Sequence, residues 1–115
     1  MKEFMFIIRG GDEYGATLSP EELQAHMKQW EEWMGSLAQK GKLVGGQPLI
    51  STGTTIVGKE KKVIDRPFAE GKELVGGYII AKADSIEEAT EIAKGCPSFE
   101  WDCSVEVREI NLMGK

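Results

Sequence analysis

The stretch LVGGYIIAKADSIEEATEIAKGCP, residues 74–97, decides the fold. Its first part, Leu74–Ala81, is apolar at both alternating positions, which is typical of a strand in the middle of a sheet. The motif Ser85-x-x-Glu88 is a capping box and predicts the start of a helix. Gly95 and Pro97 end that helix, because glycine favours the C-terminal turn and proline cannot continue it. The stretch therefore predicts one strand–helix half of an α+β domain.

A second strand–helix half precedes it. Residues 3–8 form a strand that is also apolar on both faces. Ser19-Pro20-Glu21-Glu22 combines a capping serine, a first-turn proline and a capping-box glutamate, and so starts the longest helix, which ends at Lys40-Gly41. The remaining predicted elements are a polar loop over residues 10–15, strands at Lys42–Pro48 and Ser104–Ile110, and a hairpin of Thr54–Val57 against Lys61–Ile64.

This order predicts a single α+β domain over residues 1–115, with the ferredoxin-like order β-α-β-β-α-β, an extra β-hairpin and an antiparallel sheet. In that arrangement the strands at 3–8 and 74–81 lie in the middle of the sheet, and the strand at 104–110 lies at an edge. Two helices cover only one face of a sheet. We therefore expect a second copy of the chain to cover the other face, as a homodimer.

The amino-acid composition limits the kinds of partner and the cellular location that we expect for the chain. The net charge of −5 argues against nucleic acid, and the basic cluster Lys59, Lys61 and Lys62 reads as a solvated hairpin tip. The apolar runs are too short to span a membrane, and the start is not typical of a secretory signal. Cys96 and Cys103 are expected to be free thiols, which favours a cytoplasmic protein.

His26, the only histidine, lies on the apolar stripe of the first helix. It is either a packed core residue or a general acid/base, since histidine titrates near neutral pH. A base needs an orienting acceptor, and Asp65 is the candidate. Trp30 and Trp33 on the same stripe are either core or the wall of a site for a flat apolar ligand. No spacing of His and Cys fits a metal site, and no motif points to a cofactor.

The segment Asp65-Arg66-Pro67-Phe68-Ala69-Glu70 precedes the strand at 74–81. It is either a plain turn, started by Asp65 and stiffened by Pro67, or the rim of a cleft. In the second interpretation Phe68 contacts the substrate, and Arg66 or Arg108 holds an anionic group.

The same segment, continued by Lys72-Glu73-Leu74-x-Gly76-Gly77-Tyr78, resembles the YCII-related proteins, in particular the branch named for its Asp-Gly-Pro-Phe (DGPF) motif. Further matches cover residues 3–110 and include His26, Gly41-Lys42-Leu43 and Ala93-Lys94-Gly95-Cys96-Pro97. The resemblance implies a ferredoxin-like domain that pairs into a dimeric α+β barrel. It also implies that His26 and Asp65 are the residues suspected of activity in that family.

Two positions depart from the family pattern. Arg66 stands where the motif has glycine, which strains the backbone if that position needs a positive φ. Phe99-Glu100-Trp101-Asp102 replaces a small, glycine-rich turn.

Two functions follow. The first is a cofactor-independent isomerase or lyase, with His26 as acid/base and an unknown small molecule as substrate. The alternative is a non-catalytic ligand-binding or interaction module, in which His26 belongs to the core.

Overall fold

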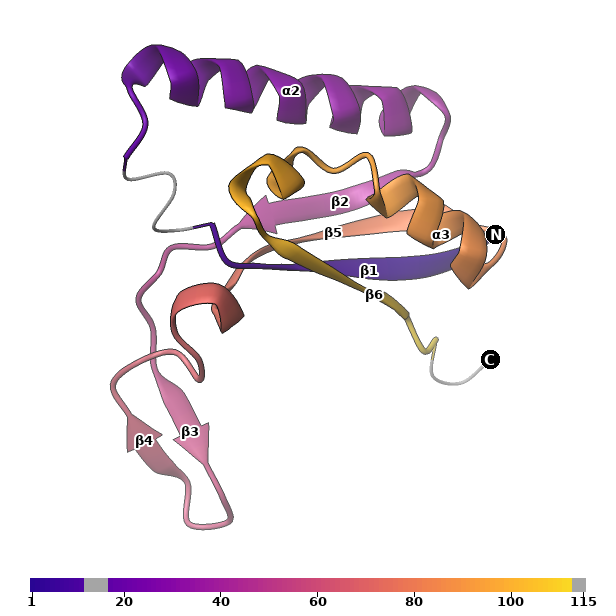
Figure 1. The fold of residues 1–115 in the computed structure, drawn as a ribbon. Helices are drawn as coiled ribbons and strands as arrows, with labels where there is room; N and C mark the ends of the chain where they lie inside the picture. Colours follow the sequence, from indigo (N-terminus) through magenta and orange to yellow (C-terminus); the bar gives the residue numbers. More distant parts are fainter. Residues whose placement is uncertain (12–16, 113–115) are drawn as a thin grey trace.

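The computed structural model describes residues 1–11 and 17–112, so most of the loop predicted over residues 10–15 lies outside the described residues. The order is the predicted one (Figure 1). The elements are β1 Lys2–Arg9, α2 Pro20–Gln39, β2 Leu43–Pro48, β3 Thr55–Val57, β4 Lys62–Ile64, β5 Val75–Ala83, α3 Ile86–Ala93 and β6 Ser104–Glu109, with 3-10 turns η1 Gly71–Glu73 and η2 Pro97–Trp101. No described helix is long and apolar enough to cross a membrane.

The main sheet has four strands in the order β2-β5-β1-β6, and every neighbouring pair is antiparallel. The two strands that are apolar on both faces, β1 and β5, occupy the middle, and the amphipathic β6 lies at an edge. The fold class, the strand order and the edge position predicted from sequence are therefore confirmed.

Both helices lie on one side of the sheet (Figure 1). The core forms where α3 covers that side, and its largest fully buried side chains are Phe4 and Phe6 of β1. Helix α2 begins as predicted, because Ser19 and Glu22 form both hydrogen bonds of a capping box. Few of its side chains are buried. Of its twenty residues only His26 and Leu37 are buried, which leaves room between this helix and the sheet.

The opposite face of the sheet carries no helix. Met5 and Ile7 of β1 pair there with Ile80 and Tyr78 of β5, and all four side chains are only partly buried. At the edge of this apolar strip Arg9 forms a 2.6 Å ion pair with Glu106. The strip therefore has an apolar centre and a charged border.

Strands β3 and β4 form a separate two-stranded sheet, as the predicted hairpin requires. This hairpin projects away from the main sheet on the side opposite the helices (Figure 1). Its tip carries Lys59, Lys61 and Lys62, all exposed, which confirms the predicted solvated turn. Lys61 adopts a positive φ of 58° there.

Candidate functional site

His26 lies in the first half of α2 and is 5% exposed, so it faces inward, in agreement with its place on the apolar stripe of the helix. Nε1 of Trp30, one turn later on the helix, donates a 3.0 Å hydrogen bond to Nε2 of His26. An indole nitrogen can only donate, so Nε2 must be an acceptor. The neutral imidazole of His26 therefore carries its proton on Nδ1.

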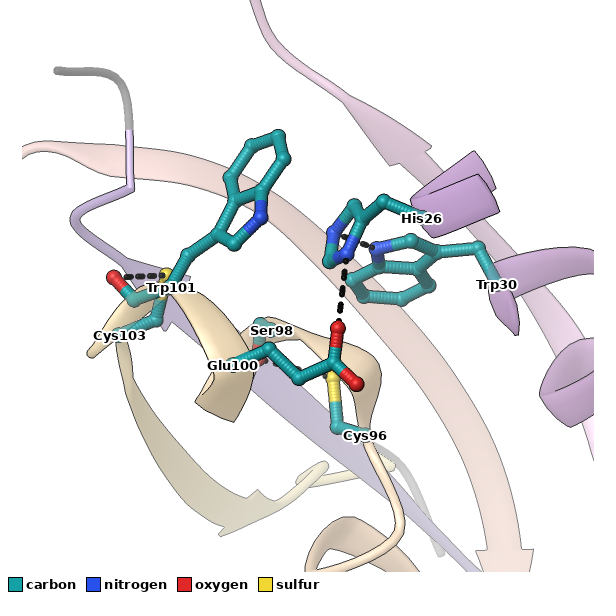
Figure 2. A network of polar contacts seen from close by, with 7 residues as sticks. All are labelled: His26, Trp30, Cys96, Ser98, Glu100, Trp101 and Cys103. Carbon is teal, nitrogen blue, oxygen red and sulfur yellow. Dashed lines mark hydrogen bonds and ion pairs between the residues drawn. The ribbon is translucent and has the colours of Figure 1, made fainter. Parts of the chain in front are cut away.

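Nδ1 of His26 faces the η2 turn (Figure 2). Oε2 of Glu100 lies 3.5 Å from it, an ion-pair distance when the ring is protonated but too long for a good hydrogen bond. Nδ1 is a buried nitrogen without a hydrogen-bond partner. The ring of Trp101 stacks on the imidazole, with centroids 4.0 Å apart and planes inclined by 14°. The η2 turn thus covers one face of His26 and supplies the nearest carboxylate.

His26 also lines a cavity of about 510 Å³ between α2 and the sheet. The size suits a small organic molecule. Its walls are mostly apolar and include Leu23, Met27, Trp30, Trp101 and Leu74. A second hollow of about 210 Å³ continues under α2 past Met34 and shares Met27 and Trp30 with the first. The long helix and the sheet therefore enclose a hollow, and Trp30 forms part of its wall, as one of its two predicted roles requires.

The segment at 65–68 lies at the base of the hairpin, next to this cavity. Asp65, Arg66 and Pro67 line a hollow that shares Ser51 with the cavity of His26. Phe68 lines another neighbouring hollow and is 84% exposed. No hydrogen bond or ion pair joins His26 to Asp65 in the part of the chain that the structure describes. The orienting role of Asp65 therefore stays a prediction.

Arg66 is engaged with its own loop. Its Nη1 donates to the carbonyl oxygens of Pro67 and Phe68 at 3.1 and 3.2 Å, and its carbonyl accepts a 2.7 Å hydrogen bond from Thr55. Its φ is not positive, so an arginine fits this backbone position without the strain considered above.

Two other predicted site residues lie elsewhere. Arg108 is exposed on β6 and pairs with Met5, on the helix-free face of the sheet. Trp33 packs beside Phe6, with ring centroids 6.5 Å apart, and its indole fills the space that Gly95 leaves open. Neither residue lines the cavity of His26.

Glu100 and Trp101 are site residues that the sequence analysis did not propose. Their segment was recognised only as a departure from the family pattern. The signal available in the sequence was the pair of bulky side chains, Phe99 and Trp101, where a small turn is usual. A glutamate and a tryptophan that replace glycines in a turn must occupy space near the cavity that the turn borders.

Both cysteines are free thiols, as predicted. Cys96 is buried beside Ser98, with 3.0 Å between Sγ and Oγ, and Cys103 lines the cavity. Burial raises the pKa of the Cys96 thiol. The pKa of the Cys103 thiol is also raised, mainly by burial and to a smaller extent by the nearby Cys96 and Asp102. Neither is therefore an activated nucleophile.

The fold and the site define a ferredoxin-like α+β domain with a cavity between its long helix and its sheet. The chain belongs to the YCII-related domain family, whose model matches residues 3–113. A similar solved structure is 5-chloro-2-hydroxyhydroquinone dehydrochlorinase (TftG) from Burkholderia phenoliruptrix AC1100, in complex with 2,5-dihydroxybenzoquinone. It is 17% identical, with a TM-score of 0.50 over 95% of this chain and 93% of that one. This likeness shows the fold. No curated protein matches the chain.

Proposed function

We propose that the chain binds a small, flat, hydroxylated molecule in the cavity between α2 and the sheet, and transfers a proton on it through His26, as an isomerase or lyase. The observation that carries the proposal is the position of His26 in the wall of a cavity of about 510 Å³. Aromatic and aliphatic walls with few polar groups are typical of sites for such ligands.

The chemistry needs only a proton acceptor and a donor. In an isomerisation, a base takes a proton from one atom and the acid returns one to another. In an elimination, the base takes the proton and the leaving group departs with the electrons of its broken bond, so no oxidant is needed. Trp30 holds Nε2 as an acceptor, and the proton of neutral His26 sits on Nδ1. In this tautomer only Nε2 has a free electron pair, so we assign proton acceptance to Nε2, which must first give up its hydrogen bond from Trp30. The imidazolium that forms keeps its other proton on Nδ1, where Glu100 balances the charge.

Asp65 and Arg66 remain candidate contacts for a polar substituent, since their hollow adjoins the cavity at Ser51. We also propose the DGPF branch of the family, because Asp65-Arg66-Pro67-Phe68 differs from that motif only at Arg66. The two free thiols support a cytoplasmic location.

The choice of a first probe comes from the similar structure. That protein is a dehydrochlorinase, which is lyase-type chemistry, and its complex contains 2,5-dihydroxybenzoquinone. The test is calorimetric titration with 2,5-dihydroxybenzoquinone, together with chloride release from 5-chloro-2-hydroxyhydroquinone. We expect binding and release by the wild type, loss of release in His26→Gln, and normal behaviour of Lys28→Gln, an exposed control on the same helix.

His26 is buried, so its variant must first be shown to fold, by circular dichroism and urea unfolding. Glu100→Gln provides a second variant that leaves the core untouched, since the Glu100 side chain is 55% exposed. It should lower turnover while the fold is kept. Unchanged turnover in both variants would remove His26 and Glu100 from the reaction.

One observation favours the alternative, a non-catalytic binding module. Both ring nitrogens of His26 are covered, Nε2 by Trp30 and Nδ1 by the η2 turn. In that function the probe binds without turnover, and His26→Gln binds it as tightly as the wild type.

We further propose that two copies pair through the helix-free face. The apolar strip of Met5, Ile7, Tyr78 and Ile80 supports this pairing, because packed sheets bury such strips at a separation of about 10 Å. Light scattering should give twice the mass of the 12.7 kDa chain.

A further inference from the structure

The hairpin of residues 54–65, called the arm below, makes the single chain unusually extended. A compact chain of 115 residues has a radius of gyration of about 13 Å. The radius of gyration of this chain is 15.7 Å. Six residues on each side of the arm, at about 3.3 Å per residue, give a reach of roughly 20 Å from the body. The arm therefore reaches beyond the space that one sheet packed on this face would occupy.

The solvent-accessible surface of the chain is also larger than that of a compact monomer. A compact monomer of 12.7 kDa has an accessible surface of about 6,200 Å². This chain exposes 8187 Å². The excess, about 2,000 Å², is in the range that one subunit buries in an obligate homodimer. A single copy of the chain therefore leaves uncovered the area that a second copy would cover.

The arm has an apolar face of its own. Ile56 and Val63 are opposite each other across the two strands, and they are 66% and 62% exposed. A two-stranded hairpin alone is marginally stable in water, and it persists when something packs against it. A cross-strand pair of large aliphatic side chains pointing to solvent is the surface on which that packing would occur.

The distribution of charge along the chain favours a second copy as the molecule that packs against the arm. The tip of the arm carries Lys59, Glu60, Lys61 and Lys62, a net charge of +2. The whole chain carries −5, so the remainder carries −7. The arm as a whole also includes Asp65 and carries +1, so the rest of the chain carries −6. The arm and the rest of a second copy therefore have net charges of opposite sign, which favours their association.

We propose that the arm clasps a second copy of the chain. The arm hangs below the sheet on the helix-free side (Figure 1), where the proposed dimer places its partner. In a two-fold dimer each arm reaches past the edge of the partner's sheet. Ile56 and Val63 then pack against the partner. This inference rests on the face-to-face dimer proposed above and adds a second contact to it.

The test compares three proteins by sedimentation equilibrium: the wild type, the double variant Ile56→Asp/Val63→Asp, and Ile86→Asp. Ile86 is an exposed apolar residue, 42% exposed, at the first position of α3, on the side of the sheet that the clasp leaves free. We expect the arm variant to raise the dimer dissociation constant at least tenfold, and the Ile86 control to leave it unchanged. Urea unfolding at low concentration should show that neither changes the stability of the single chain.

Cross-linking then locates the contact. A photoactivatable maleimide is attached to Ile56→Cys in a chain whose Cys96 and Cys103 are replaced by serine, so that it reacts only at position 56. In dimers mixed from ¹⁵N-labelled and unlabelled chains it should give links between copies. A wild-type chain that stays monomeric at 100 µM overturns both the dimer and the clasp. A dimer that is insensitive to the arm variant, with links only within one chain, overturns the clasp and leaves the face-to-face dimer standing.

Discussion

Trp30 donates its indole proton to Nε2 of His26 from one turn away on the same helix, across 3.0 Å. Both side chains point from α2 toward the sheet, so this bond orients the imidazole before any ligand arrives. It also determines which nitrogen carries the proton of the neutral ring. The helix therefore supplies both the site residue and the group that holds it.

Trp30→Phe should lower the free energy of unfolding by about 1–3 kcal/mol, because it leaves the buried Nε2 of His26 without a donor. Urea unfolding measures the change. Trp33→Phe is the matched control. It makes the same change from indole to phenyl in a side chain that packs against the core, but the indole nitrogen of Trp33 donates no hydrogen bond among the described residues. Equal losses in both variants would mean that ring volume, and not the hydrogen bond, accounts for the effect.

Gly46→Ala should destabilise the sheet by about 1–3 kcal/mol. A β-carbon at Gly46 would lie 2.5 Å from Cδ1 of Ile79 and 2.6 Å from the carbonyl oxygen of Tyr78. Gly45→Ala, one residue earlier in β2, meets no atom within 4 Å and should be close to neutral. Thermal unfolding of the pair measures the difference. Similar melting temperatures would show that β2 shifts easily relative to β5.

Glu88→Gln should weaken the fold in a pH-dependent way. Nζ of Lys42 donates to Oε1 of Glu88 at 3.1 Å, and this hydrogen bond lowers the pKa of the Glu88 carboxyl below its usual value of 4.5. A carboxyl with a lowered folded pKa stabilises the fold above its unfolded pKa, and that contribution is lost as pH falls through the folded pKa. The difference in stability between wild type and variant should therefore be present at pH 6 and vanish near pH 3.

Glu87→Gln is the control for that series, because it removes a neighbouring charge from the same helical turn without breaking an ion pair in the described chain. Chemical denaturation at several pH values compares the two variants. If the difference in stability between wild type and Glu88→Gln is the same at every pH in this range, the contribution of the contact between Lys42 and Glu88 does not depend on the charge of the carboxyl group.

Iodoacetamide should modify Cys103 before Cys96, and both more slowly than in the urea-unfolded chain at pH 8. Burial raises the pKa of each thiol, so the reactive thiolate is scarcer than in a free cysteine and increases as pH rises. Peptide mass mapping follows the order, and Cys103→Ser identifies the first site. Because Cys103 lines the cavity, a bound probe should slow its modification.

Much of this architecture is readable from local pattern. Capping residues such as Ser19 and Ser85 specified where the helices begin, since their side chains accept hydrogen bonds from nearby backbone nitrogens. The apolar residues at both parities in β1 and β5 specified the central strands. These signals are local, so each of them can be recognised in a short segment without reference to the rest of the chain.

The site was harder to predict because it is made by contacts between distant segments. His26 was selected by residue type, and its neighbour Trp30 is local to it. Glu100 and Trp101 reach it from a turn far along the chain, and no periodicity links that turn to α2. Asp65 was chosen by chemistry and motif, whereas the carboxylate beside the imidazole belongs to Glu100.

The position of β1 has a consequence for how the chain folds. Its two neighbours are β5, which begins at residue 75, and β6, which begins at residue 104. Because β1 precedes both partners along the chain, it waits for them during synthesis until residues 75–109 have followed. During that interval an apolar segment, Phe4–Ile8, is unpaired and open to chaperones or to other nascent chains.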